Sequence, residues 1–110
     1  MPLRHLVLLN FTPETTVDDV TDITEALRTL PALIPELAAY HVGPNLGIAD
    51  GTWDYGIAAD FADQDDWATY RDHPDHVRII HDLIAPKVRE RAAVQYDLDQ
   101  VAGPAVGHEG

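Results

Sequence analysis

Apolar and polar residues alternate with two different periods along this chain, and each change of period marks a new element. Residues 4–11 alternate with period two, which places His5, Val7 and Leu9 on one face of a strand. From Thr16 the apolar residues recur with the spacing of an amphipathic helix. The same reading predicts, in order, a strand at 4–11, a helix at 16–30, strands at 38–46 and 53–61, helices at 63–71 and 74–88, and a strand at 89–98.

Threonines and prolines predict where the helices begin and end. Thr15 or Thr16 suits the N-cap of the first helix, because a short hydroxyl side chain can accept a hydrogen bond from an unpaired backbone N–H. Pro31 should end that helix and leave a tight turn. Pro74 suits the first position of the last helix, and Pro86 should bend or loosen its final turn.

This order of elements predicts an α+β, ferredoxin-like fold, in which a four-stranded antiparallel sheet carries its helices on one face. The other face would expose Leu6 and Leu8, and such an apolar surface is normally covered. We therefore expect a homodimer in which two sheets pack face to face as a dimeric α/β barrel. Residues 1–98 should form this domain, and residues 99–110, rich in glycine and without periodicity, should form a disordered tail.

Charge and composition narrow the classes of partner. The chain has 110 residues, of which 7 are Lys or Arg and 19 are Asp or Glu, so its formal net charge is −12. Such a surface repels phosphate backbones and anionic lipids, which argues against nucleic acid and membranes as partners. There is no cysteine and no apolar run of membrane-spanning length, so we expect a cytoplasmic protein without a disulfide, a thiol nucleophile or a cysteine-based zinc site.

Three local patterns occur in a set order: RHLVLLNF at 4–11, IPEL at 34–37 followed by Gly43, and YRDHPDHV at 70–77. With these motifs, residues 3–98 resemble the stress-responsive dimeric α/β-barrel (Dabb) domain family. The resemblance implies a dimeric barrel with a pocket between sheet and helices in each subunit. It also implies similarity to olivetolic acid cyclase-type polyketide cyclases, which close a poly-β-keto thioester by aldol condensation without a cofactor.

The resemblance assigns catalytic roles to Tyr70 and His76 of the late motif and places His5 at the same pocket. The cyclases carry a histidine where this chain has Tyr55, and a pocket tyrosine where it has Leu27. No metal or cofactor is expected, although some plant relatives hold magnesium through three backbone carbonyls. The substrate-binding residues expected here are Val7, Leu9, Ile23, Leu27, Tyr55, Ile57 and His73, and the carbonyls corresponding to the magnesium site are those of Pro31, Ile34 and Leu37.

Each of these side chains also has a structural interpretation. His76 can serve as a general base near neutral pH, or it can pack or cap at a helix start. Tyr70 can donate a hydrogen bond to a developing oxyanion, or anchor its short helix in the core. His5 can bind substrate, orient His76 or be a satisfied core histidine, and His73 suits the cap of the following helix. His41 and His81 have no partner that the sequence identifies.

Three functions follow from these alternatives. The first is a cofactor-independent cyclase or lyase that acts on an enolisable small molecule, with His76 as base and Tyr70 as hydrogen-bond donor. The second is a noncatalytic stress-responsive or ligand-binding barrel whose interior is filled by side chains. The third is a cofactor-independent monooxygenase of the antibiotic-biosynthesis type, against which the His-Pro-Asp-His motif at 73–76 argues.

Overall fold

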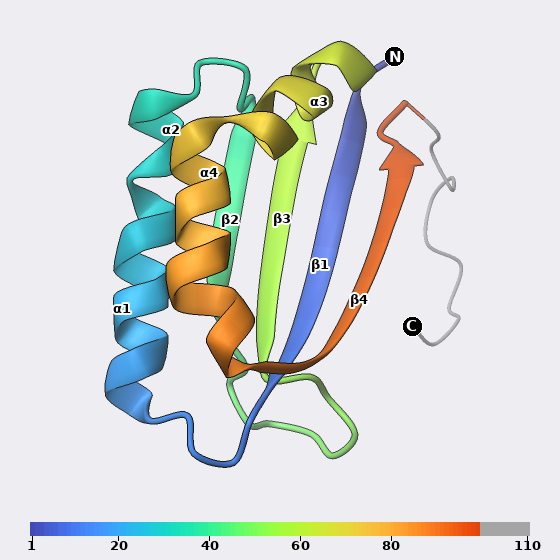
Figure 1. Cartoon of the computed structure of the whole chain (residues 1–110). Coiled ribbons are helices and arrows are strands. Elements are labelled where there is room, and N and C mark those ends of the chain that lie inside the picture. Colours follow the sequence, from blue (N-terminus) through green and yellow to red (C-terminus); the bar gives the residue numbers. More distant parts are fainter. Residues whose placement is uncertain (100–110) are drawn as a thin grey trace, which may run out of the picture.

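A computed structural model describes residues 1–99, and it shows one antiparallel sheet with its helices packed against one face (Figure 1). The disordered tail expected at 99–110 lies almost wholly outside the described residues. The elements are β1 (Leu3–Phe11), α1 (Val17–Arg28), α2 (Leu30–Leu33), β2 (Ala39–Pro44), β3 (Tyr55–Phe61), α3 (Gln64–Asp72), α4 (Pro74–Ile79), a π-helical turn η1 (Ile80–Ile84), a 3₁₀ turn η2 (Ala85–Lys87) and β4 (Val88–Asp97).

The four strands lie in the order β2-β3-β1-β4, and every neighbouring pair is antiparallel. This is the ferredoxin-like arrangement that the order of elements predicts. The helices contact mainly β2 and β3, whereas β4 lies at the far edge of the sheet (Figure 1). Most residues of β4 are exposed, so this half of the sheet is open, and the site described below lies there.

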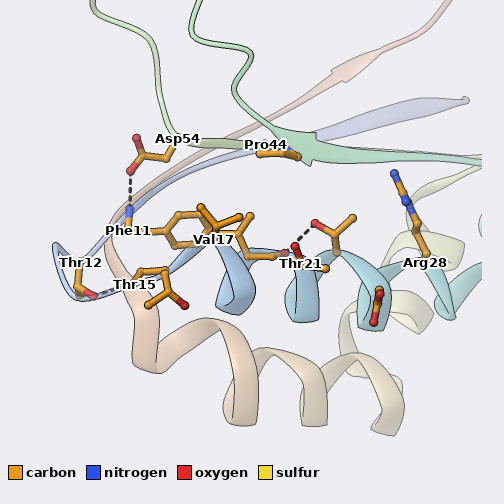
Figure 2. Close-up of a pocket in the computed structure, with 12 residues that line it drawn as sticks. Phe11, Thr12, Thr15, Val17, Thr21, Arg28, Pro44 and Asp54 are labelled. Atoms are coloured by element: carbon orange, nitrogen blue, oxygen red, sulfur yellow. Dashed lines mark hydrogen bonds between the residues drawn. The ribbon is translucent and has the colours of Figure 1, made fainter.

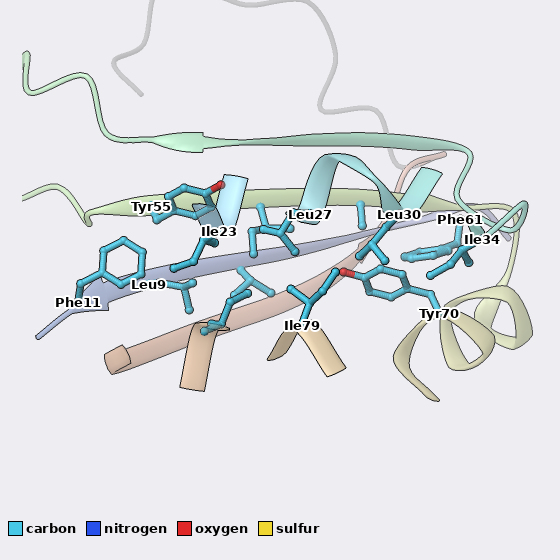
Figure 3. Close-up of a cluster of buried hydrophobic side chains, with 14 of the residues drawn as sticks. Leu9, Phe11, Ile23, Leu27, Leu30, Ile34, Tyr55, Phe61, Tyr70 and Ile79 are labelled. Atoms are coloured by element: carbon cyan, nitrogen blue, oxygen red, sulfur yellow. The ribbon is translucent and has the colours of Figure 1, made fainter. Parts of the chain in front are cut away.

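The core lies between the sheet and the helices, as the period-two pattern of the strands requires (Figure 3). Every second residue of β1 and of β3 is buried. Burying a large aliphatic or aromatic side chain contributes roughly 1.5–3 kcal/mol, so this layer supplies most of the stabilisation of the fold. The largest fully buried side chains are those of Leu9, Ile23, Leu27, Leu30, Ile34, Tyr55, Phe61 and Ile79.

The start of the first helix matches the capping prediction. Thr16 Oγ1 accepts a hydrogen bond from the Asp19 amide at 3.1 Å, and Asp19 Oδ2 accepts one from the Thr16 amide at 2.9 Å. This reciprocal pair satisfies two of the N–H groups that a helix start leaves unpaired.

The predicted end of the first helix needs correction. α1 ends at Arg28, and Pro31 lies in the first turn of the short helix α2 rather than in a plain turn. The reason is that a proline in a first helical turn loses no hydrogen bond, since the N–H it lacks would be unpaired there.

The last helix changes its pitch before β4 begins. Residues Pro74–Ile79 are α-helical, Ile80–Ile84 form a π-helical turn, and Ala85–Lys87 form a 3₁₀ turn. Pro86 lies in that 3₁₀ turn, where its missing N–H breaks the regular ladder, so the loosened final turn predicted from Pro86 is present.

Candidate functional site

A cavity of about 470 Å³ lies between the helical layer and the open half of the sheet. β1 and β4 form its floor, and α3, α4 and η1 form its opposite wall. The volume lies within the range of small-molecule sites. Its lining residues are His5, Val7, Leu9, Leu27, Ile57, Trp67, Tyr70, Arg71, His76, Ile80, Ile84, Ala85, Val88, Arg91, Ala93 and Gln95.

His76 lines this cavity from the first turn of α4. His73 caps the helix, because its Nδ1 accepts a hydrogen bond from the Asp75 amide at 3.2 Å, and Pro74 begins it. This start places His76 Nδ1 3.1 Å from the Arg71 carbonyl oxygen, to which it donates its proton. The neutral ring then carries an unprotonated Nε2, and burial lowers the pKa of the His76 imidazole below its ordinary value.

Tyr70 lies directly against this imidazole, with ring centroids 4.1 Å apart. Its phenol is buried, and its hydroxyl lies 3.1 Å from the hydroxyl of Tyr40 on β2. Burial raises the pKa of the Tyr70 phenol, and this effect exceeds the lowering by the Tyr40 hydrogen bond. Tyr70 therefore stays protonated near neutral pH, and when Tyr40 donates to it the Tyr70 proton is left for a ligand.

His5 enters the same cavity from the floor. Gln95 on β4 donates from Nε2 to His5 Nδ1 at 2.8 Å, so the proton of the neutral ring is on His5 Nε2. Burial lowers the pKa of His5 to about 4, and the charge of Arg91 and, when it is protonated, that of His76 act in the same direction. The cavity thus holds two imidazoles that are both neutral at physiological pH.

Not all of the expected lining residues reach this cavity. Val7, Leu9, Leu27 and Ile57 do, together with His5, Tyr70 and His76. The other three expected residues lie elsewhere: Ile23 is in the core, Tyr55 is buried with its hydroxyl 2.7 Å from that of Thr24, and His73 caps α4.

A second hollow, of about 520 Å³, lies along α1 near the ends of β1 and β2 (Figure 2). It is lined mainly by threonine and aliphatic groups, with Glu25, Arg28 and Asp54 as its charged residues. No imidazole lines it, so it lacks a group that titrates near neutral pH. The cavity at His76 is consequently the better candidate for acid–base chemistry.

Residues 1–99 contain no group of three or more His, Asp or Glu side chains placed to hold a metal ion. Of the backbone carbonyls that correspond to the magnesium site of plant relatives, that of Ile34 accepts a hydrogen bond from the Leu37 amide at 3.1 Å. Over the same residues, no helix is both long and apolar enough to cross a bilayer.

Several polar residues of the site were not singled out by the sequence. Arg91 and Gln95 reach the cavity from β4, Arg71 reaches it from α3, and Tyr40 contacts it through Tyr70. The period-two pattern places Arg91 and Gln95 on one strand face. The pattern does not predict which half of the sheet the helices leave uncovered.

The chain belongs to the stress responsive A/B barrel domain (Dabb) family, whose model matches residues 3–98. Among curated proteins, none matches the sequence.

Solved structures with the same fold include two dimeric ferredoxin-like proteins of unknown function. One, from Thermobifida fusca, is 41% identical, with 89% of this chain and 92% of that chain covered and a TM-score of 0.84. The other, from Bacteroides fragilis, is 28% identical, with 88% and 96% covered and a TM-score of 0.76. A hydroxynitrile lyase from Passiflora edulis is 14% identical, with 91% and 95% covered and a TM-score of 0.78, a likeness of fold alone.

Proposed function

We propose that this protein is a cofactor-independent enzyme of the cyclase or lyase type, acting on an enolisable small molecule. One observation supports this most directly: the cavity brings a neutral imidazole, His76, into contact with a protonated phenol, Tyr70. Enolisation needs a base for the carbon-bound proton and a donor for the oxygen that becomes negative. The two side chains supply these functions.

In the proposed reaction, His76 Nε2 removes a proton from the carbon between two carbonyl groups of the substrate. The electron pair of the broken C–H bond moves onto the neighbouring oxygen, where Tyr70 donates a hydrogen bond to the enolate. The enolate carbon then attacks the carbon of another carbonyl group further along the same molecule, which forms the ring bond. The resulting alkoxide takes the proton back from His76, so the base returns to its starting form.

Two further contacts support this assignment. The Arg71 carbonyl fixes the tautomer of His76 by accepting from Nδ1, which directs the basic lone pair to Nε2. The Tyr40 hydroxyl can donate a hydrogen bond to the Tyr70 hydroxyl, which orients the phenol before the substrate binds. Preorganised donors of this kind contribute a few kcal/mol to a transition state.

The test is to replace His76 by alanine and assay poly-β-keto substrates, both as free acids and as N-acetylcysteamine thioesters, following ring formation by absorbance and mass spectrometry. We expect turnover to fall by about 100-fold or more, the usual contribution of a general base. His81→Ala is the matched control, because His81 is an exposed imidazole outside the cavity lining. Unchanged turnover in the His76 variant, with its circular dichroism spectrum intact, would refute the mechanism and leave a noncatalytic ligand-binding barrel.

We also propose that the protein works as a homodimer joined through the outer face of its sheet. The solved relatives from T. fusca and B. fragilis are described as dimeric. In this chain the outer face carries Leu6 and Leu8 on β1, and on β4 the large side chains of Val94 and Tyr96 are 50% and 44% exposed. Since the cavity lies on the opposite face of the sheet, the dimer leaves its lining within one subunit.

A further inference from the structure

Charge is distributed differently at the cavity and over the rest of the molecule. Acidic residues outnumber basic ones by 19 to 7 in the chain. Within residues 1–99, however, the cavity lining includes Arg71 and Arg91 and neither Asp nor Glu. An acidic surface repels anions, so in this protein the cationic lining favours anions at the cavity in particular.

The two arginines differ in what they contact. Arg71 donates from Nε and Nη2 to the two carboxylate oxygens of Asp72, each at 2.9 Å, and its guanidinium carbon lies 4.8 Å from the centre of a Trp67 ring. Arg91 is exposed, and its side chain takes part in no hydrogen bond or ion pair with another of residues 1–99. A guanidinium offers five N–H donors, so Arg91 keeps its full donor capacity for a ligand.

The position of Arg91 on β4 sets where a ligand would be held. Arg91 pairs with Leu9 of β1, while Gln95, four residues further along β4, pairs with His5. Four strand residues span about 13 Å, so Arg91 and the His5–Gln95 pair lie well apart along the cavity floor. The positive charge of Arg91 also acts in the direction of a lower pKa at both His5 and Tyr70, as expected of a cation facing the same space.

We propose that Arg91 binds a carboxylate of the substrate, so that the site takes an organic acid in preference to its neutral amide or ester. This inference rests on the proposed function, since it assigns the charge of the molecule on which His76 acts. A planar carboxylate matches the fork of a guanidinium and can form two parallel charge-assisted hydrogen bonds with it. The carboxylate would be held at Arg91 and the enolisable carbon at the His76 imidazole, which lines the same cavity.

The experiment compares two probes of nearly the same shape and different charge, 2-naphthoate and 2-naphthamide, by isothermal titration calorimetry at neutral pH. We expect the wild-type protein to bind naphthoate at least about tenfold more tightly than naphthamide, and Arg91→Gln to bind the two about equally. Naphthamide affinity should not change in Arg91→Gln, which shows that the cavity itself is intact. Arg89→Gln removes the same charge from β4 outside the cavity lining and should keep the preference.

Equal affinities in the wild-type protein, a preference that survives in Arg91→Gln, or no binding of naphthoate would each overturn the proposal. His76→Ala separates this inference from the proposed function. That variant should lose turnover while it keeps the preference for naphthoate. If the wild-type protein shows no preference for naphthoate while its turnover still depends on His76, the role of Arg91 is refuted and the proposed function is not.

Discussion

His5 and His76 face one cavity from different elements, β1 and α4, and burial lowers the pKa of both imidazoles. At an exposed position a histidine is partly protonated at slightly acidic pH, and the protonated fraction cannot accept a proton. Here the low polarity of the cavity keeps the ring of His76 neutral, and the Arg71 carbonyl decides which nitrogen carries its proton. A residue with an ordinary solution pKa thus becomes a suitable base through its position.

The same burial predicts how stability depends on pH. The pKa of His5 is about 4 in the folded protein and near 6.5 in the unfolded chain, so between these values the unfolded state binds more protons. We therefore expect the free energy of unfolding to be fully maintained above about pH 6.5 and to fall as the pH is lowered toward 4. Urea titrations at successive pH values measure this slope, to which His76 contributes in the same direction.

His5→Gln should make that slope shallower, because glutamine does not titrate and can still bond with Gln95. His81→Gln is the control, since it makes the same substitution at a side chain that is 85% exposed and leaves His5 in place. An unaltered slope in His5→Gln would contradict the assignment.

The residues of the site differ in how well the sequence predicts them. His76, Tyr70 and His5 could be named because a short motif and a strand position mark them, and the cavity brings all three together. Arg91 could not be named in this way, because its role depends on which half of the sheet the helices leave open. Tyr40 shows the same limit, since its contact with Tyr70 joins residues 30 positions apart.

At the scale of elements, the sequence predicts which helices and strands exist better than it predicts the residues at which they end. The buried faces of β1 and β3 follow from alternation, and Thr16 is one of the two residues whose chemistry predicts the cap of α1. The one-turn helix α2 and the π-helical turn η1 could not be predicted from the sequence. Pro31 and Pro86 interrupt the regular helical hydrogen bonds there, and the packing around them sets the local pitch. η1 matters for the site, since Ile80 and Ile84 contact the cavity from it.

The capping box of α1 allows a direct test at this scale. Thr16→Ala removes the hydroxyl that accepts from the Asp19 amide, and we expect it to lower the free energy of unfolding by about 1 kcal/mol. Urea denaturation measures this change. Thr21→Ala is the control, because Thr21 is exposed within α1 and alanine favours helix, so stability should hold or rise slightly. Equal losses in the two variants would show that capping is not the cause.

At the scale of the whole molecule, two faces of one sheet serve different purposes. The face toward the helices holds the core and the cavity, whereas the outer face leaves Val94 and Tyr96 about half exposed. Arg4 and Asp60 form a bidentate ion pair on that outer face, with distances of 2.7 and 2.9 Å, so their charges compensate each other there. The part of the outer face around Leu6, Leu8 and Val94 is thus apolar, although Glu90 lies at one end of that face and the chain as a whole is strongly acidic.

This combination predicts a dimer whose strength depends on salt. Two chains that each carry −12 repel one another at long range, while their outer faces gain by burying Leu6, Leu8 and Val94. Sedimentation velocity should therefore show a dimer that tightens as ionic strength rises, because salt screens the repulsion and leaves apolar burial in place. Val94→Glu should shift the protein to monomer, since it buries an unpaired charge at the interface, whereas Thr21→Glu adds the same charge on an exposed position of α1 and should leave the dimer intact. A dimer that persists in Val94→Glu would show that the two copies meet through a different surface.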